Sequence, residues 1–285
     1  MNEIYEDTKF LMKKYGIKAN KKLGQNFLID ENVLDNIVNA SEINKNDLVI
    51  EIGPGLGTLT KKLLEKAGKV ISIELDERMI NILKQRFFMY NSFEVIYKDV
   101  LKVNLKELIQ ENKKDLNLQK VKIVANLPYY ITTSIIMKLL EEKLEIESIT
   151  VMVQKEVADR LVAFPGQRNS GAITYTVYYY ASSEEVMEVP SNCFIPEPEV
   201  TSKIIKLNLR KEPIVNVTDE KRFFEIIKVA FMQRRKTFLN AISNSNLNIS
   251  KEKVEEILKN LNINTKIRAE ALTIEQIADI SKVLK

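Results

Sequence analysis

Apolar and polar residues follow a regular pattern along the first half of the chain. Short apolar runs are each followed by a segment in which apolar residues recur every three or four positions. Runs of the first kind predict buried strands, and segments of the second kind predict amphipathic helices. The predicted strands occupy residues 47–53, 69–76, 93–100, 120–128 and 148–154. The predicted helices occupy residues 58–68, 77–87, 104–114, 133–143 and 155–163.

This alternation predicts the fold class. Strands that are apolar on both faces and separated by helices indicate a parallel sheet covered by helices, which is an α/β, Rossmann-like architecture. Such sheets bind their ligands at the carboxyl ends of the strands. Residues that come directly after each strand are therefore the first candidates for a functional site.

The segments that flank this alternation are less regular. Residues 1–46 predict helices with a break at 23–26, and Gly68 is typical of the position just after a helix. Residues 170–182 are rich in β-branched and aromatic side chains, so a strand and a helix both remain open there. Residues 184–209 predict two strands joined by a proline-rich loop.

The chain changes character near its C-terminus. Residues 219–285 contain no glycine and have a helical period, which predicts a small all-helical domain. We therefore expect a ligand-binding domain over residues 1–210, with a basic helical segment at 1–46, and a helical domain over residues 211–285.

The amino-acid composition excludes several classes of catalytic and metal site. The chain of 285 residues is 45% hydrophobic and 29% charged, which is typical of a globular protein, and no apolar run is long enough for a membrane helix. Cys193 is the only cysteine and no signal peptide is evident, so we expect a cytoplasmic protein. Histidine is absent, which excludes Ser-His-Asp triads and histidine metal ligands, and we expect no metal.

Positive charge is concentrated in two stretches, although the net charge is only +4. Residues 9–22 hold six lysines and no acid, and residues 203–236 hold ten basic and four acidic residues. Local basic patches indicate a polyanionic partner. Solvated lysine faces are the simpler interpretation.

Glycines and acids follow the first three predicted strands. The first strand runs into EIGPGLG (51–57), and the third glycine of a dinucleotide fingerprint would fall at Thr58 instead. The second strand ends at Glu74 and the third at Asp99. An acid at the end of the second strand can accept hydrogen bonds from ribose hydroxyls. Each feature alone is also compatible with a tight turn or a helix cap.

Together, these three strand ends predict a site for an adenosine group with an amino-acid tail. The glycine spacing suits a ligand without a pyrophosphate, and Asp99 can accept a hydrogen bond from an adenine amino group. S-adenosylmethionine is the natural candidate. Methyl transfer from its sulfonium requires a positioned nucleophile rather than a histidine or a metal, which agrees with the composition.

The fourth predicted strand ends in VANLPYY (124–130). The amino group of adenine is a poor nucleophile because its lone pair is delocalised into the ring. Hydrogen bonds to the Asn126 side-chain oxygen and the Leu127 carbonyl would localise that lone pair, and Pro128 confines Leu127 to extended geometry. Tyr129 offers a ring on which a flipped base could stack. A turn followed by two half-buried aromatic residues is the simpler interpretation.

Four segments, in this order and spacing, resemble the ribosomal RNA adenine dimethyltransferase family: LGQNFL, EIGPGLG, NLPYYITTSI and FIPEPEVTS. The C-terminal segments FMQRRKTFLNAI and RAEALTIEQIADISKVL are similar to the small-subunit enzyme of that family. The resemblance implies dimethylation of two adjacent adenines near the 3′ end of 16S ribosomal RNA, with S-adenosylmethionine as cofactor. It also implies a small ribosomal subunit particle as substrate, a role in ribosome biogenesis and a monomeric enzyme.

The resemblance also implies roles for single residues. The cofactor would be bound by Asn26, Leu28, Gly53, Glu74, Asp99 with Val100, and Asn126. The acceptor site would be formed by Asn126, Leu127, Pro128 and Tyr129, with Phe194 stacked on the other face of the target adenine. Phosphates would be bound by Gln233, Arg234, Arg235 and Lys236. For Phe194, core packing of a loop is the simpler interpretation.

The sequence departs from the family pattern in places and leaves two other functions open. Tyr130 and Ser134 stand where many members have asparagine and proline. Resistance enzymes of the family, which act on 23S RNA, usually read N-I-P-Y where this chain reads NLPY. A non-enzymatic RNA-binding or transcription factor could use the same scaffold, but Glu74, Asp99 and Asn126 argue against it.

Overall fold

The computed structural model describes residues 3–20, 23–116 and 118–284, so Lys21 and Lys22 of the lysine-rich stretch lie outside it. The chain divides into two compact units. Unit 1 comprises Met1–Ala158 and Glu184–Leu209, and unit 2 comprises Asp159–Ser183 and Arg210–Lys285. Residues 159–183, which the sequence places in the first domain, therefore group with the C-terminal helices.

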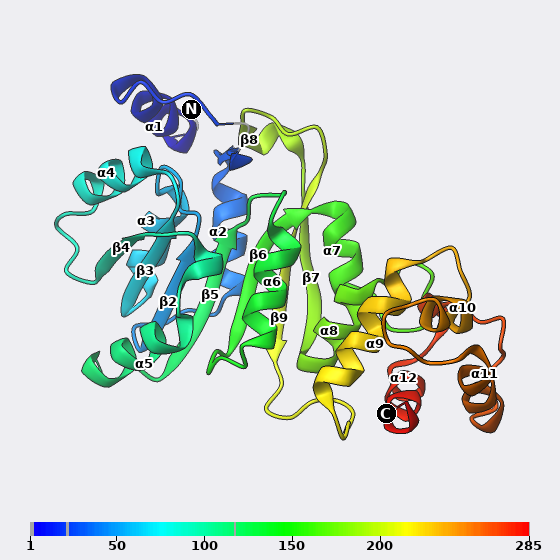
Figure 1. Cartoon of the computed structure of the whole chain (residues 1–285). Helices are drawn as coiled ribbons and strands as arrows, with labels where there is room; N and C mark the ends of the chain where they lie inside the picture. The colour runs from blue at the N-terminus through cyan, green and yellow to red at the C-terminus, as the bar shows by residue number, and fades with distance from the viewer. Residues whose placement is uncertain (1–2, 21–22, 117, 285) are drawn as a thin grey trace. The chain divides into compact units, whose positions relative to one another are not determined.

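Unit 1 is built on a seven-stranded sheet with the order β4-β3-β2-β5-β6-β9-β7 (Figure 1). Its strands are β2 (Asp47–Ile52), β3 (Lys69–Glu74), β4 (Phe93–Tyr97), β5 (Lys120–Asn126), β6 (Ser148–Gln154), β7 (Ala181–Val189) and β9 (Ser202–Leu209). Neighbouring strands from β4 to β6 are parallel, whereas β9 pairs antiparallel with β6. The predicted α/β, Rossmann-like class is confirmed.

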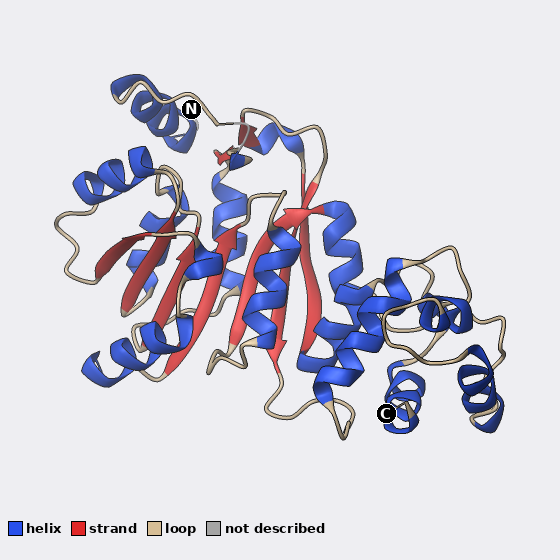
Figure 2. Cartoon of the chain, viewed as in Figure 1, coloured by secondary structure: helices blue, strands red, loops and turns tan. Residues whose placement is uncertain are grey.

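The apolar strands occupy the centre of the sheet for a simple reason. All six residues of β2 are buried, and Ile50 lies in register between Ile71 and Ile123. Helices cover both faces (Figure 2), so every apolar side chain of a central strand removes surface from water. These helices are α2 (Glu31–Ala40), α3 (Thr58–Lys66), α4 (Glu77–Arg86), α5 (Leu105–Leu116), α6 (Thr132–Glu141) and α7 (Lys155–Val162).

Gly68 follows α3, as predicted, but the reason for a glycine at this position is not a helix cap. α3 ends at an extended Ala67, and Gly68 does not have the left-handed backbone expected after a helix. A Cβ atom at this glycine would lie 2.3 Å from the carbonyl oxygen of Lys45. Close approach of two backbone segments therefore explains the glycine.

The N-terminal region contains helices, as the sequence predicts, and a short strand that the sequence did not indicate. α1 (Glu3–Lys14) precedes β1 (Phe27–Leu28). β1 pairs antiparallel with β8 (Phe194–Ile195), which follows the short helix η3 (Ser191–Cys193). Leu28 and Phe194 are partners in this pairing. Another short helix of unit 1, η2 (Val100–Lys102), follows β4.

Unit 2 is helical. Its helices are α8 (Ala172–Tyr180), α9 (Glu220–Met232), α10 (Phe238–Ser243), α11 (Lys251–Asn260), η4 (Ala269–Ala271) and α12 (Ile274–Val283). The ambiguous segment 170–182 is thus a helix that leads into β7. Tyr175 of α8 is fully buried, and its hydroxyl donates to the Leu272 carbonyl at 2.5 Å. Burial raises the pKa of Tyr175 to about 12.

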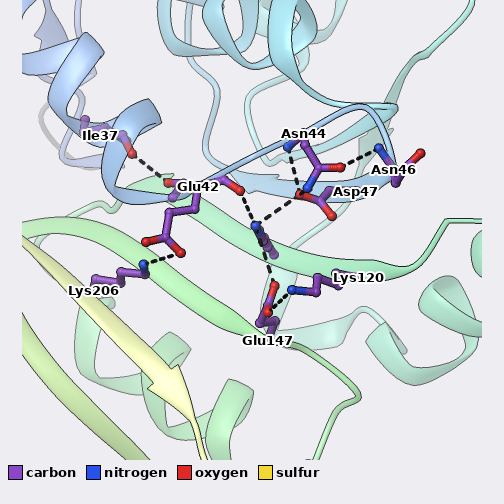
Figure 3. A network of polar contacts seen from close by, with 10 residues as sticks. Ile37, Glu42, Asn44, Asn46, Asp47, Lys120, Glu147 and Lys206 are labelled. Carbon is purple, nitrogen blue, oxygen red and sulfur yellow. Dashed lines mark hydrogen bonds and ion pairs between the residues drawn. The ribbon is translucent and has the colours of Figure 1, made fainter.

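A network of charged groups joins the N-terminal ends of several strands in unit 1 (Figure 3). Lys122 of β5 is only 3% exposed, and its ammonium lies 3.1 Å from Asp47 Oδ2 and 2.5 Å from the Glu42 carbonyl oxygen. Glu147 lies 3.6 Å from the same ammonium, and Lys206 of β9 lies 3.1 Å from the Glu42 carboxylate. The network therefore ties the turn after α2 to β2, β5 and β9.

Candidate active site

A pocket that is partly open to solvent lies in unit 1 at the carboxyl ends of the parallel strands. The ends of β2, β3 and β5, the loop after β4 and residues 23–28 line it. The lining includes every residue of the predicted cofactor and acceptor sets except Phe194: Asn26, Leu28, Gly53, Glu74, Asp99, Val100, Asn126, Leu127, Pro128 and Tyr129. The carboxyl ends of the strands thus bring together residues that are far apart in the sequence.

The glycine loop after β2 has a left-handed backbone at Gly53, Gly55 and Gly57. A Cβ atom at Gly57 would lie 2.6 Å from the Phe87 ring, so a larger residue would displace that ring. The loop is also fixed from outside, because Arg86 donates a 2.8 Å hydrogen bond to the Leu56 carbonyl. This turn leaves room beside the backbone for a ligand.

Glu74 is held by the backbone around it. Its carboxylate accepts hydrogen bonds from the N–H groups of Gly55 at 3.1 Å, Leu75 at 2.7 Å and Asp76 at 2.9 Å. Burial raises the pKa of Glu74, and these three donors oppose the shift. The glycine loop and the end of β3 are therefore fixed relative to each other through one carboxylate.

Asp99 follows β4 and caps η2, because its Oδ1 accepts from the Leu101 N–H at 3.0 Å. Its side chain is half-buried, and the neighbouring Val100 is buried. A carboxylate beside an apolar side chain suits an adenine ring, which has both a polar edge and an apolar face. The cap and a ligand contact are compatible, since each carboxylate oxygen can accept two hydrogen bonds.

Asn126 ends β5, and its amide nitrogen donates to the Asn26 carbonyl at 3.3 Å. In the part of the chain that the structure describes, the Asn126 side-chain oxygen accepts no hydrogen bond, so it remains available to a donor on a ligand. The N–H of Leu127 donates to the Met152 carbonyl at 3.1 Å, which fixes the start of the following turn.

The turn after Asn126 is held at two further points. The carbonyl of Pro128 accepts from the Thr132 hydroxyl at 3.0 Å, and the Tyr129 hydroxyl lies 2.7 Å from the Ser202 hydroxyl. Burial raises the pKa of Tyr129, so this phenol stays neutral at physiological pH. The half-buried Tyr129 ring therefore has a fixed place beside the pocket.

Phe194 does not line the pocket with the other acceptor residues. Its ring is 1% exposed and belongs to the hydrophobic core of unit 1. The structure thus places this side chain in core packing. A stacking role would require the loop that carries it to move.

Sequence reasoning missed Gln25, which lines the pocket next to Asn26. Its amide nitrogen donates to Asp76 Oδ2 at 2.9 Å, and its oxygen accepts from the Asn20 N–H at 2.9 Å. Asp76 also pairs with Arg78 at 2.5 Å, and this pair holds the pKa of Asp76 low. Gln25 therefore fixes residues 23–28 to the end of β3. No spacing rule indicates a contact between residues 51 positions apart.

Glu51 is a second pocket residue to which sequence reasoning gave no role. It is 1% exposed, and its Oε2 accepts from the hydroxyls of Thr60 and Ser72 at 2.7 Å. Its Oε1 is buried and has no hydrogen-bond partner among the described residues. Burial, opposed by the two hydroxyl donors, raises the pKa of Glu51 to about 7.

The raised pKa of Glu51 predicts a pH dependence of stability. The folded protein binds this proton more tightly than the unfolded chain does, so the contribution of Glu51 is largest below about pH 4.5 and is lost as the pH rises to about 7. Glu51→Gln should remove this dependence. Unfolding free energies measured at about pH 5 and about pH 8 should show the variant gaining stability relative to the parent at the higher pH. An equal pH dependence in both proteins would contradict the prediction.

The basic residues proposed to bind RNA lie in unit 2, where α9 ends. Arg234, Arg235 and Lys236 are exposed, whereas Gln233 is half-buried and ends the helix. Arg234 donates to the Ser170 carbonyl at 3.1 Å, which places the exposed Arg168 on a neighbouring loop. Arg168 is therefore a further candidate that the sequence pattern did not indicate.

The residues described contain neither a metal site nor a membrane span. In residues 3–20, 23–116 and 118–284, no three or more Cys, Asp or Glu side chains are grouped so that they could hold a metal ion. No helix in these ranges is long and apolar enough to cross a bilayer.

A parallel Rossmann-like sheet, a left-handed glycine loop after β2 and acids after β3 and β4 define an S-adenosylmethionine-dependent methyltransferase. The family model described as ribosomal RNA adenine dimethylase matches residues 16–285, and the chain belongs to that family.

Individual relatives agree with this assignment. A protein of Alkaliphilus oremlandii named ribosomal RNA small subunit methyltransferase A is 47% identical over 269 residues, covering 94% of this chain and 93% of that protein. The crystal structure of a dimethyladenosine transferase from Plasmodium falciparum is similar with a TM-score of 0.73 and 28% identity, covering 89% of this chain and 95% of that one. The 23S rRNA methyltransferase ErmE shares the fold, with a TM-score of 0.66, 24% identity and coverage of 91% and 99%.

Proposed function

We propose that this chain dimethylates the exocyclic amino groups of two adjacent adenines near the 3′ end of 16S ribosomal RNA, within a small ribosomal subunit particle. The observation that carries the proposal is the Asn126 side-chain oxygen, which is available at the end of β5 beside the cofactor pocket. The name of the Alkaliphilus relative supports the small-subunit substrate. We propose further that the enzyme is a cytoplasmic monomer acting in ribosome biogenesis.

The polar groups of the pocket, as well as its position, suit S-adenosylmethionine. Glu51, Glu74 and Asp99 contribute three carboxyl groups to the lining, and the buried Glu51 Oε1 lacks a partner among the described residues. When bound, the cofactor supplies an activated methyl group on a cationic sulfonium. Asn26, Leu28 and Gly53 would hold its amino-acid part, Glu74 its ribose, and Asp99 with Val100 its adenine.

The residues of the acceptor site would act by holding the target amine in a reactive orientation. The Asn126 oxygen and the Leu127 carbonyl would accept hydrogen bonds from the two N–H groups of the target amine and draw its nitrogen out of conjugation with the ring. Tyr129 would support the base, and Pro128 keeps the Leu127 carbonyl in extended geometry. Each group is already fixed by the contacts of the turn, so little reorganisation is needed when the base enters.

The proposed RNA contacts of unit 2 give a separate prediction. Arg235→Gln with Lys236→Gln should weaken RNA binding and make the negative slope of log K against log salt shallower by about 1.4. Each lost phosphate contact removes about 0.7 from the size of that slope. Filter binding to small-subunit particles at several salt concentrations measures this slope. Lys251→Gln with Lys253→Gln on α11 is a control with the same charge change. Equal slopes in both variants would refute the assignment.

The proposed function is tested by offering the purified chain two substrates with radiolabelled S-adenosylmethionine. We expect label in undermethylated 30S particles, at two adjacent adenines that primer extension then maps. Label in free 23S RNA alone would show a resistance-type specificity instead. Absence of S-adenosylmethionine binding by calorimetry would exclude the enzymatic function.

A further inference from the structure

The lysine-rich N-terminal stretch has no role in the pocket described above. α1 presents Lys9, Phe10, Lys13 and Lys14 to solvent, and Lys18 is exposed shortly after the helix ends. Residues four apart lie next to each other on a helix, so Lys9 adjoins Lys13 and Phe10 adjoins Lys14. We call these five residues the α1 basic face.

The opposite side of α1 is fixed to the body of unit 1. Thr8 and Leu11 are buried, Asp7 forms an ion pair with Arg86 of α4, and the Tyr15 hydroxyl donates to Gln85 at 2.9 Å. α1 lies beside α4 in Figure 1, as these contacts require. The α1 basic face is therefore a surface of a packed element and does not belong to a free tail.

Three of the four lysines of this face have no acidic partner among the described residues. Lys13, Lys14 and Lys18 form no ion pair with any described residue, whereas the buried or half-buried Lys62, Lys122 and Lys206 of unit 1 all do. Lys9 differs, because a hydrogen bond with Tyr5 and the charge of Glu6, one turn before it, raise its pKa. Like charges on adjacent turns repel one another, so a polyanion bound there would relieve an existing repulsion.

An exposed aromatic ring lies among these lysines. Phe10 is 61% exposed, and the Lys14 ammonium lies 5.8 Å from its ring centroid and 5.1 Å from that of Tyr15. An apolar ring in water is costly, but RNA bases stack on such rings when cations nearby hold the backbone. Unpaired RNA thus offers chemistry that matches both kinds of side chain.

The chain connects this face to the pocket. After α1 it turns at Gly16, which has a φ of +61°, and the Ile17 N–H donates to the Met12 carbonyl at 2.8 Å. Residues 23–28 of the same segment then line the pocket, where Gln25 fixes them to Asp76. The α1 basic face therefore precedes, in the same N-terminal region of the chain, the residues that line the pocket.

We propose that the α1 basic face binds the ribosomal RNA that flanks the target adenines, with lysines on phosphates and Phe10 stacked on an unpaired base. The inference rests on the proposed function, because it assigns a second contact surface to the same substrate. It differs from the contacts proposed for unit 2, since it lies in the unit that holds the active site.

Charge neutralisation tests the phosphate contacts. Lys13→Gln with Lys14→Gln should make the negative slope of log K against log salt, measured with undermethylated 30S particles, shallower by about 1.4. Lys66→Gln with Lys106→Gln, which removes two exposed lysines from α3 and α5, should leave the slope unchanged. Circular dichroism and calorimetry with S-adenosylmethionine should show the same fold and cofactor affinity in both variants. An unaltered slope in the α1 variant would overturn the proposal.

Loss of the aromatic contact should change the affinity but not its salt dependence. Phe10→Ala should weaken particle binding roughly tenfold without changing the salt slope, because a stacked base is lost and no charge is removed. Phe10→Tyr should retain wild-type affinity. Full affinity of Phe10→Ala for particles would overturn the assignment to RNA. The same holds if Phe10→Ala loses binding to vesicles of anionic phosphatidylglycerol while its RNA binding is unaltered, because Phe10 would then contact a membrane surface. If the parent chain binds particles but never methylates them, the proposed function fails while the slope test of α1 still stands.

Discussion

Asn126→Ala is expected to lower the rate of methyl transfer by about 10²–10³-fold, the range found when one positioned hydrogen-bonding group is removed from an active site. The alanine removes the only side-chain acceptor at the end of β5 that has no partner among the described residues. Single-turnover methylation of undermethylated 30S particles measures the effect.

Cofactor affinity should change much less than the rate in the same variant, because the other predicted cofactor-binding residues remain and the hydrogen bond lost is the 3.3 Å bond to the Asn26 carbonyl. Calorimetry with S-adenosylmethionine tests this half of the prediction. Asn126→Asp is the matched variant, since it keeps the acceptor oxygen but cannot donate to Asn26, and it should retain more activity than the alanine. Turnover of Asn126→Ala near the parent rate would show that the side-chain oxygen takes no part in the reaction.

Lys122→Ala is expected to destabilise unit 1 by about 3–5 kcal/mol, because it leaves the buried Asp47 without its cation. Asp47 is 1% exposed and keeps only the two hydrogen bonds from Asn44, both to Oδ2. Its Oδ1 already lacks a partner among the described residues. Urea unfolding followed by circular dichroism measures the change, and hydrogen exchange of β5 assigns it to unit 1.

Two further variants test whether the unpaired buried charge of Asp47 causes the loss of stability. Lys120→Ala removes a neighbouring lysine whose side chain is 52% exposed, and it should change stability little although it breaks a pair with Glu147. Lys122→Met combined with Asp47→Asn should be more stable than Lys122→Met alone, since the unpaired charge is then gone. If the double variant were the less stable of the two, an isolated buried charge would not be the cause.

The sheet and most of the pocket were predictable because they follow from one geometric rule. Parallel strands end at the same edge, so Gly53, Glu74, Asp99 and Asn126 had to lie near one another once the alternation of strands and helices was recognised. The residue types then indicated the ligand. Contacts between loops were not predictable in this way, because no periodicity links Gln25 to Asp76 or Leu28 to Phe194.

Burial was a further feature that the sequence pattern could not give. The aromatic and β-branched segment 170–182 forms α8 because Tyr175 and Tyr179 are enclosed by the core of unit 2, which overrides a preference for strand. Phe194 was assigned by resemblance to a base contact, yet its ring is enclosed by the core of unit 1. Lys122 lies in a run that reads as an apolar strand, and only the surrounding carbonyl and carboxylate oxygens explain its place there.

The pairing of β1 with β8 has a thermodynamic consequence. Leu28, proposed to contact the cofactor, and Phe194, proposed to contact the base, are register partners, and the Ile29 N–H donates to the Cys193 carbonyl at 2.9 Å. Any movement that frees the Phe194 ring must break these bonds or carry the cofactor-binding segment with it. Affinities for cofactor and RNA are then linked, and by reciprocity each ligand changes the affinity of the other by the same factor. One measurement, the cofactor affinity with and without bound particle, gives that factor for both.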